Sequence, residues 1–161
     1  MIYLFKYKDS FILSHQNASD IALSGKSNIK RTNKLSLYSC VAGPVYIKDL
    51  NHWTLLYVDI ITSTVFYFDP LINSNSNQST FDTVFNNWLQ FAQEFSDLKN
   101  IQWQKPSMHT QTQQDNFSCG VFVCYFFSLL KKKDLNFLVN LNLSSFRAHI
   151  DETIFKYLKN N

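Results

Sequence analysis

The sequence predicts an α+β domain, and three patterns carry this prediction. Runs of β-branched and aromatic residues, short enough to be strands, are concentrated in residues 35–68. Apolar residues recur at helical spacing in residues 81–95 and again in residues 146–158. Residues 120–130 are apolar almost all round, which is typical of a helix at the centre of a domain. Strands in the middle with helices around them give an α+β architecture.

The length and composition fit one globular domain. The chain has 161 residues, of which 45% are hydrophobic and 16% aromatic, so it can bury a sizeable core. We expect a single domain over residues 1–161, in which residues 1–34 form a short N-terminal region. The net charge of +3 is small and dispersed, which does not favour a nucleic-acid partner. The basic run Lys131-Lys132-Lys133 is better explained as a helix C-terminus than as a ligand-binding patch.

The sequence also gives no sign of a membrane span, a metal site or a disulfide framework. The longest apolar run, residues 121–130, is well short of the ~20 residues that cross a bilayer. The N-terminal residues are too short a run, and too interrupted by lysine, for a signal peptide. Cys40, Cys119 and Cys124 are odd in number and lack paired Cys-x-x-Cys spacing. We therefore expect reduced thiols, an intracellular location and no metal or other cofactor.

The N-terminal region shows the weakest patterns. Residues 2–7 alternate loosely between apolar and polar and predict an edge strand. Residues 9–32 are polar, so we expect a loop-rich segment with at most one helical turn at residues 20–23. His15 lies in this segment without an evident partner and is expected at the surface.

The strand-forming region begins at residue 35. Residues 35–41 and 44–48 predict two short strands joined around Ala42-Gly43. Residues 53–59 and 64–68 predict a further pair of strands connected by a short turn.

The second pair of strands places two polar side chains at one edge of the sheet. His52 comes just before the first strand, and Asp69 follows the second, where Pro70 ends the ladder. In an antiparallel hairpin the start of the first strand lies opposite the end of the second. His52 and Asp69 are therefore expected at the same edge, although they are seventeen positions apart.

The C-terminal half predicts helices separated by polar loops. After an Asn/Ser loop at residues 71–79, Thr80 is expected to cap the helix of residues 81–95. Residues 101–103 predict a short strand, and residues 107–118 a polar loop. A cap at Ser144 or Ser145 is expected to start the last amphipathic helix.

The strongest chemical signal is the junction at Cys119, where a polar segment ends and the apolar helix begins. Unpaired backbone N–H groups and the positive end of the helix dipole favour a thiolate there. Gly120 leaves room for a substrate to approach the backbone. This combination is typical of a nucleophilic cysteine, whereas Cys40 and Cys124 are expected to be small core residues.

A cysteine nucleophile needs a base, a group that orients the base, and donors for the oxyanion. His52 is the best placed of four histidines to act as the base, and Asp69 is the best placed to orient it. The backbone N–H of Cys119 is one oxyanion donor, and the side-chain amide of Gln113 or Gln114 is a second. Each residue alone has an ordinary structural explanation, but their order and positions together favour a catalytic site.

Three blocks of sequence resemble one known family. They are His52-Trp53 at the start of residues 52–59, Asp69-Pro70 at the end of residues 66–70, and Gln-x-Asp-x-x-x-Cys-Gly at residues 113–120. This pattern resembles the ubiquitin-like-protein protease family, the SUMO- and Nedd-type-specific cysteine proteases related to the adenovirus protease. The resemblance covers residues 45–130. It implies a papain-like α+β fold with a central mixed or antiparallel sheet, flanking helices and the nucleophile at the N-terminus of a central helix.

The resemblance also implies roles for single residues. His52 is expected to be the general base, Asp69 its orienting partner and Cys119 the nucleophile. Gln113, six residues before Cys119, is expected to be the oxyanion donor. The residues expected to contact the substrate are Trp53, Gln114 and Gly120.

The implied activity is cleavage of ubiquitin or a ubiquitin-like modifier after its C-terminal Gly-Gly. The expected partners are the modifier and its conjugates, with no nucleic acid and no membrane, and the protein is expected to be a monomer. The expected location is the cytoplasm or nucleus, or the host cytosol for a bacterial effector. Three alternatives stay open: a same-clan acetyltransferase, a polyprotein-processing protease, and a modifier-binding module without catalysis.

The chain departs from the family in one respect. Eukaryotic members carry a Trp-Leu-Asn-Asp-type segment upstream of the histidine, which covers the Gly-Gly tail of the modifier. No tryptophan precedes Trp53 here. The sequence therefore does not indicate how the tail is held.

Overall fold

The computed structural model describes residues 9–71, 77–106, 112–132 and 142–159, apart from the side chains of Asn77, Gln78 and Tyr157. Its elements are β1 (Ser10–Ile12), α1 (His15–Ser24), η2 (Leu35–Leu37), β2 (Cys40–Ile47), η3 (Lys48–Leu50), β3 (His52–Asp59), β4 (Thr64–Phe68), α2 (Asn77–Gln93), α3 (Cys119–Lys131) and α4 (Leu143–Lys159).

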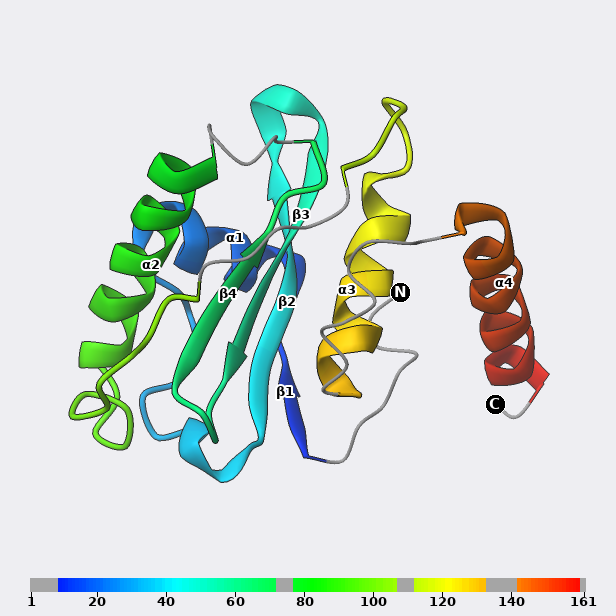
Figure 1. The fold of residues 1–161 in the computed structure, drawn as a ribbon. Coiled ribbons are helices and arrows are strands. Elements are labelled where there is room, and N and C mark those ends of the chain that lie inside the picture. Colours follow the sequence, from blue (N-terminus) through cyan, green and yellow to red (C-terminus); the bar gives the residue numbers. More distant parts are fainter. Residues whose placement is uncertain (1–8, 72–76, 107–111, 133–141, 160–161) are drawn as a thin grey trace.

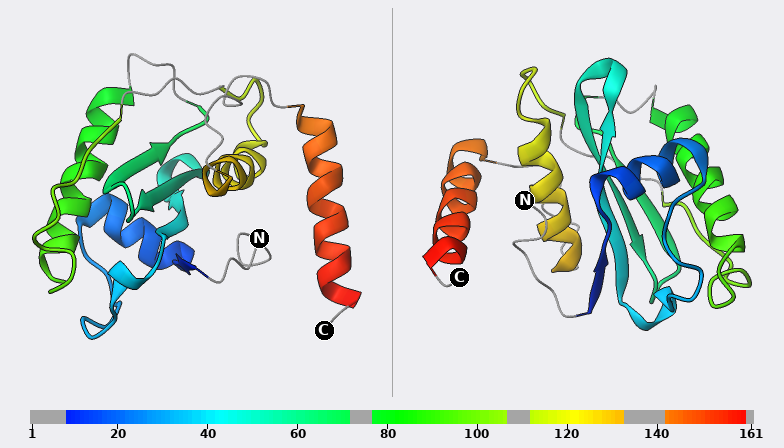
Figure 2. Two further views of the ribbon diagram at one scale, coloured as in Figure 1. Left: turned by 60° about the horizontal axis from the view of Figure 1, so that its bottom comes forward. Right: turned by 180° about the vertical axis from the view of Figure 1, so that it is seen from behind.

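The elements form layers around one sheet. The strand order is β1-β2-β3-β4; β1 pairs with β2 in parallel, and the other neighbours are antiparallel. Helices α1 and α2 cover one face of this mixed sheet, α3 covers the other, and α4 lies outside α3 (Figures 1 and 2). The predicted α+β fold, with a central sheet flanked by helices and Cys119 at the start of a central helix, is confirmed.

The prediction of two strands joined at Ala42-Gly43 was wrong, because β2 runs unbroken from Cys40 to Ile47. β1 pairs only with residues 40–42 of β2. Beyond that point the outer side of β2 has no strand among the described residues, and a proline is tolerated on such an edge. Pro44 therefore does not end the strand. Gly43 is needed for close approach, since a Cβ atom there would lie 2.6 Å from the Cβ of Leu13.

The helix α1 was missed, since at most one turn was expected in this region. The Oγ of Ser14 accepts from the N–H of Asn17 at 3.2 Å, and Gly25 ends the helix in the left-handed conformation, with φ of 68°. The apolar face of α1 consists only of small or widely spaced residues, Ala18, Ile21 and Ala22, all of which are buried. The many polar residues around this narrow face concealed the helical period.

Several boundaries differ from the prediction. The helix α2 begins at Asn77, so Thr80 lies inside it and is not its cap. The helix α4 begins at Leu143, where the side chain of Asn142, not a serine, accepts from the N–H of Ser145 at 3.0 Å.

The remaining predictions concern the paired strands, the central helix and two short strands. The strands of residues 53–59 and 64–68 and the helix of residues 120–130 are confirmed as β3, β4 and α3. Residues 101–103 form no strand, and only a single bridge joins Thr64 to Gln104 nearby. The strand predicted at residues 2–7 lies outside the described residues. In the described sheet, β1 and β4 are the edge strands.

The sheet separates two apolar layers. Leu56 and Val58 of β3 point into the layer under α1 and α2, and the alternate residues Leu55 and Tyr57 point toward α3. The α3 layer is rich in aromatic rings from β4 and α3: Phe66, Phe68, Phe122, Phe126 and Phe127. Phe68 stacks on Phe126 with ring centroids 4.9 Å apart. This packing fixes α3 on the sheet and so fixes the position of Cys119 at its first turn.

The C-terminal end of α3 is held by polar contacts. The Nζ of Lys131 donates to Asp9 Oδ1 and to Ser39 Oγ, both at 3.1 Å. The hydrogen bond from Ser39 and the contact with Lys131 lower the pKa of Asp9. Lys131 is the last residue of α3, as the helix-terminus explanation of the basic run predicts.

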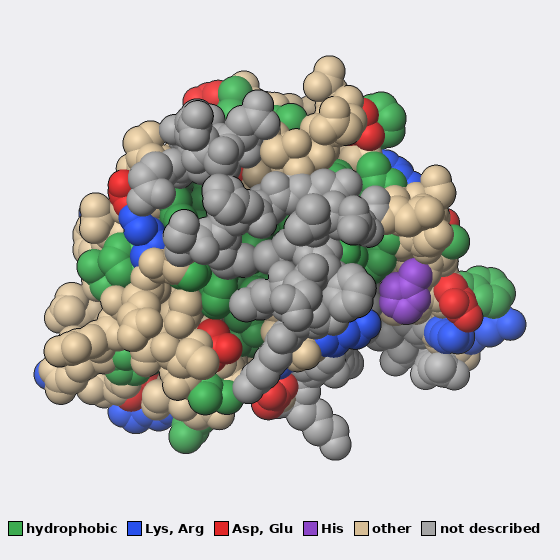
Figure 3. Space-filling model, viewed as in Figure 1, with side chains coloured by type: hydrophobic (Ala, Val, Ile, Leu, Met, Phe, Trp, Pro, Cys, Tyr) green, Lys and Arg blue, Asp and Glu red, His purple; other side chains and the backbone are tan. Residues whose placement is uncertain are grey.

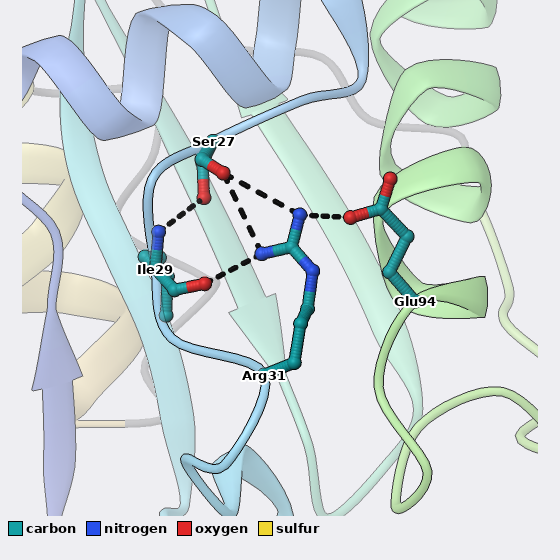
Figure 4. Close-up of polar contacts among 4 residues, drawn as sticks. All are labelled: Ser27, Ile29, Arg31 and Glu94. Atoms are coloured by element: carbon teal, nitrogen blue, oxygen red, sulfur yellow. Dashed lines mark hydrogen bonds and ion pairs between the residues drawn. The ribbon is translucent and has the colours of Figure 1, made fainter.

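An arginine network ties the loop after α1 to the residues that directly follow α2. Arg31 donates to the carbonyl oxygens of Ile29 and Ser27 and forms an ion pair with Glu94 (Figure 4). Its guanidinium also lies 5.0 Å from the ring centroid of Phe95. This loop therefore packs against the apolar layer under α1 and α2, although it has no regular secondary structure.

The basic side chains are dispersed over the surface, as the sequence predicts. On the face shown in Figure 3, lysine and arginine side chains lie in separate groups and not in one stripe. Among the described helices, none is both long and apolar enough to cross a membrane.

Gly43 gives a test of the close packing between β2 and the start of α1. We expect Gly43→Ala to reduce the free energy of unfolding by about 1–3 kcal/mol, because the added methyl group overlaps Leu13. Gly120→Ala is the matched control, since a Cβ there meets nothing within 4 Å. Thermal or urea unfolding measures both variants, and equal stability of the two would contradict the close packing.

Candidate active site

The paired hairpin β3–β4 brings His52 and Asp69 together, as the sequence predicts. β3 begins at His52, and Asp69 directly follows β4, whose Phe68 pairs with Leu55. The Nε2 of His52 lies 2.7 Å from Asp69 Oδ1. His52 is 2% exposed and Asp69 is 5% exposed, so the pair is shielded from water.

The orientation of this pair determines which imidazole nitrogen can react. The N–H of Leu71 donates to the same Oδ1 of Asp69 at 2.9 Å, which holds the carboxylate in place. Because Nε2 is engaged by Asp69, Nδ1 is the nitrogen that is left to exchange a proton with a nucleophile.

Cys119 is the first residue of α3, where the sequence predicts it. Its side chain is 7% exposed. The N–H groups of Val121 and Phe122 donate to the carbonyl of Ser118 at 2.9 and 3.1 Å, which closes the first turn. The thiol therefore lies at the positive end of the dipole of a 13-residue helix.

The loop before Cys119 is attached to the end of the hairpin. The backbone N–H of Gln113 donates to the carbonyl of Pro70 at 2.7 Å. This bond connects the loop that leads to Cys119 with the residue next to Asp69. The two halves of the candidate site are thus joined directly by the backbone.

The two glutamines of the loop lie in different environments. Gln113 is 8% exposed, and its Nε2 donates to the carbonyl of Asp115 at 2.5 Å. Since an amide NH₂ carries two hydrogens, the second remains for an oxyanion. Gln114 is exposed, and its amide has only a long contact of 3.4 Å with the carbonyl of Thr112. Burial next to the hairpin favours Gln113 as the donor, while Gln114 stays a predicted substrate contact.

Asp115 organises the turn into α3, a role that the sequence reasoning did not assign. Its Oδ1 accepts from the N–H groups of Phe117 and Ser118 at 3.0 and 2.7 Å, and its Oδ2 accepts from Ser118 Oγ at 2.5 Å. The hydrogen bond from Ser118, with the backbone donors, lowers the pKa of Asp115. The Asp-x-x-Ser spacing before a helix is a signal that could have revealed this turn.

Arg147 is a second residue that the sequence reasoning missed. Its Nη2 donates to Ser118 Oγ at 2.9 Å, from the helix α4. No local pattern indicates a contact between residues 29 positions apart.

Trp53 follows His52 on β3. Its ring lies 4.7 Å from that of Tyr46 and 6.0 Å from that of His15, measured between centroids. His15 is exposed, as predicted, but it contacts Trp53 from the start of α1. The helix that was missed therefore reaches the neighbourhood of a tryptophan that is predicted to contact the substrate.

The other two thiols are core residues. Cys40 is fully buried and Cys124 is 2% exposed, and burial raises the pKa of Cys124 to about 11. No disulfide joins the three cysteines, all of which lie in the described part of the chain. Among the described residues, no group of three His, Cys, Asp or Glu side chains is arranged to hold a metal ion.

The chain matches the family described as the Ulp1 protease family, C-terminal catalytic domain, over residues 5–161. No curated protein sequence matches it.

Solved structures share its fold at low sequence identity. One is the C-terminal Ulp1 protease domain in complex with Smt3, the yeast ortholog of SUMO, with a TM-score of 0.69, 15% identity and coverage of 88% of this chain and 64% of that one. Another is the SUMO protease Ulp1 with its catalytic cysteine oxidised to a sulfonic acid, with a TM-score of 0.68, 17% identity and coverage of 88% and 65%. A third is the Ulp1-like SUMO protease catalytic domain of Chaetomium thermophilum, with a TM-score of 0.56, 15% identity and coverage of 86% and 58%. The chain thus spans less than two thirds of the length of these structures.

The three thiols are expected to differ sharply in reactivity. At pH 7.5 a thiol with a pKa of about 11 is ionised in roughly one molecule in 3,000, so Cys124 is expected to resist iodoacetamide. Cys119 is expected to react first, and Cys40, which is fully buried, only after unfolding. Peptide mass spectrometry after brief alkylation measures this order. Modification of Cys124 before Cys119 in the folded protein would contradict the assignment.

Proposed function

Because this chain belongs to the Ulp1 protease family, we propose that it is a cysteine protease that cleaves a ubiquitin-like modifier after its C-terminal Gly-Gly. The observation that carries the proposal is the buried 2.7 Å pair of His52 and Asp69, bonded through Pro70 and Gln113 to the loop that ends at Cys119. A shielded histidine–carboxylate pair activates a cysteine nucleophile when the thiol lies within reach of the imidazole.

The reaction begins with proton transfer from the Cys119 thiol to Nδ1 of His52. The sulfur attacks the carbonyl carbon of the last glycine, and the tetrahedral intermediate collapses to a thioester. His52 returns the proton to the departing lysine amine. Water then attacks the thioester and gives a proton to His52, the modifier leaves with a free carboxylate, and the proton returns to the thiol. Asp69 keeps the imidazole in the orientation that both transfers need.

The oxyanion of both intermediates is stabilised by hydrogen-bond donors. We assign this role to the backbone N–H of Cys119 and to the second amide hydrogen of Gln113. Loss of one such donor typically costs about 10²–10³ in rate. The bond from Gln113 to the carbonyl of Asp115 holds the amide in position before the substrate arrives.

The modifier that we propose first is of the SUMO type, because one structure of similar fold is a complex with Smt3, the yeast ortholog of SUMO. Ubiquitin and Nedd-type modifiers are the competing substrates. Trp53, in ring contact with Tyr46 and His15, supports an apolar wall for the glycine tail, and Gly120 leaves open space beside the nucleophile. The three cysteines without a disulfide support work in a reducing compartment, the cytoplasm or nucleus.

A panel of activity probes tests the proposal. SUMO, Nedd-type and ubiquitin derivatives with an electrophilic C-terminus are incubated with the wild type, Cys119→Ala and His52→Ala. We expect one class of probe to label Cys119 in the wild type, with labelling absent in Cys119→Ala and slowed in His52→Ala. A folded wild type that reacts with none of the three probes would refute modifier cleavage. Cys119-dependent transfer from an acyl-CoA donor would then indicate an acetyltransferase instead.

Asp69→Asn tests the orienting carboxylate. The amide removes the charge that stabilises the imidazolium and allows the wrong tautomer, so kcat is expected to fall by about 10²–10⁴ with little change in KM. Asp59→Asn at the other end of β3 is the matched control, since that side chain accepts from the N–H of Thr62 and lies away from the pair. Equal kcat values in the two variants would remove Asp69 from the mechanism.

A further inference from the structure

The turn before Cys119 is contacted by a helix that carries none of the predicted catalytic residues. The helix α4 lies on the outer side of α3 (Figures 1 and 2). From it, Arg147 Nη2 donates to Ser118 Oγ at 2.9 Å, and its guanidinium carbon lies 5.9 Å from the ring centroid of Phe117. Both contacts fall on the two residues that precede the nucleophile.

The contact continues through a chain of hydrogen bonds. The hydroxyl of Ser118 has one hydrogen, which it donates to Asp115 Oδ2 at 2.5 Å, so its lone pair is left to accept from Arg147. The other oxygen of Asp115 accepts from the backbone N–H groups of Phe117 and Ser118. The buried hydroxyl of Ser118 therefore accepts from a cation and donates to an anion. Hydrogen bonds that involve a charged group are stronger than those between neutral groups.

These bonds restrain the backbone next to the reacting sulfur. The N–H and the Oγ of Ser118 are both engaged. Its carbonyl, which shares a peptide with the Cys119 N–H, accepts from Val121 and Phe122, so that peptide has a fixed direction. That peptide carries the N–H of Cys119, which is the backbone oxyanion donor in the proposed mechanism. Fixed donors are more effective than mobile ones, because they need no reorganisation during the reaction.

We propose that Arg147 is a positioning residue that holds the side chain of Ser118, and with it the turn, in the reactive conformation and so contributes to the direction of the Cys119 N–H. The proposal rests on the proposed protease function. Arg147 acts through Ser118 and Asp115, since its hydrogen bond goes to Ser118 Oγ and not to the reacting sulfur.

The attachment of α4 does not depend on this arginine alone. The ring of Phe146 lies 5.2 Å from that of Tyr125 on α3, and Ile150 is 5% exposed. These apolar contacts dock α4 on α3 independently of the polar chain. Removal of Arg147 is therefore expected to loosen the turn while α4 stays in place.

Steady-state kinetics on the full chain test the proposal, with a fluorogenic C-terminal derivative of whichever modifier labels the wild type. Arg147→Ala is expected to lower kcat about tenfold, or about 1.4 kcal/mol in the barrier, with KM changed less than about twofold. Arg147→Lys keeps a donor and a charge and is expected to recover part of the loss. Lys156→Ala is the matched control, because this cation on the same helix pairs only with Glu152 at the surface among the contacts described.

A double-mutant cycle separates positioning from simple destabilisation. In a Ser118→Ala background the chain is already broken, so adding Arg147→Ala is expected to change kcat by less than about twofold. Full additivity of the two losses would overturn the proposal. So would a kcat equal to that of Lys156→Ala, or a loss explained entirely by the fraction of unfolded protein in a thermal melt.

Two readouts do not require the protease function. Arg147→Ala is expected to increase amide hydrogen exchange at residues 117–119 and to change the rate of iodoacetamide reaction at Cys119. If the wild type cleaves no modifier derivative, the proposed function fails, and these two measurements still decide whether Arg147 positions the turn. Unchanged exchange and alkylation would overturn the positioning role itself.

Discussion

The packing of the aromatic face of α3 against the sheet is the constraint on which the candidate site depends. Phe122, Phe126 and Phe127 are almost fully buried against β3 and β4. This burial, worth roughly 1.5–3 kcal/mol for each large apolar side chain, places the helix and therefore its first residue. Lys131 fixes the opposite end to Asp9 and Ser39. Cys119 thus needs no contact of its own to be held at the edge of the sheet.

Apolar packing places α3 but does not orient individual side chains, because the hydrophobic effect is not directional. Direction comes from hydrogen bonds with carboxylates: Asp69 orients His52, and Asp115 orients the turn before Cys119. The lowered pKa of Asp115 means that folding favours its ionised form. Its contribution to stability is therefore complete above the usual carboxyl value of 3.8 and is lost as the pH falls through the lower value of the folded protein.

The predictable features were those encoded by nearby residues. Strands β3 and β4 are continuous β-branched and aromatic runs, so the hairpin and the meeting of His52 with Asp69 followed from the sequence. The helix α1 was hidden, because its buried face consists of Ala18, Ile21 and Ala22 in a polar segment. The unbroken course of β2 could not be predicted either, since only the short pairing with β1 makes Pro44 acceptable.

The contacts that were missed share one physical property: they join elements distant in the sequence through single polar side chains. His15 meets Trp53 from α1, and Arg147 meets Ser118 from α4. Hydrophobic periodicity identifies which face of a helix is buried, but it does not say which partner a residue at the margin of that face will meet. Both contacts fall on residues next to the candidate site, Trp53 beside His52 and Ser118 before Cys119, so the missed contacts lie where the proposed chemistry takes place. The predictable hairpin and central helix carry the proposed reacting groups, and the contacts from the flanking helices α1 and α4 can change without replacing those groups.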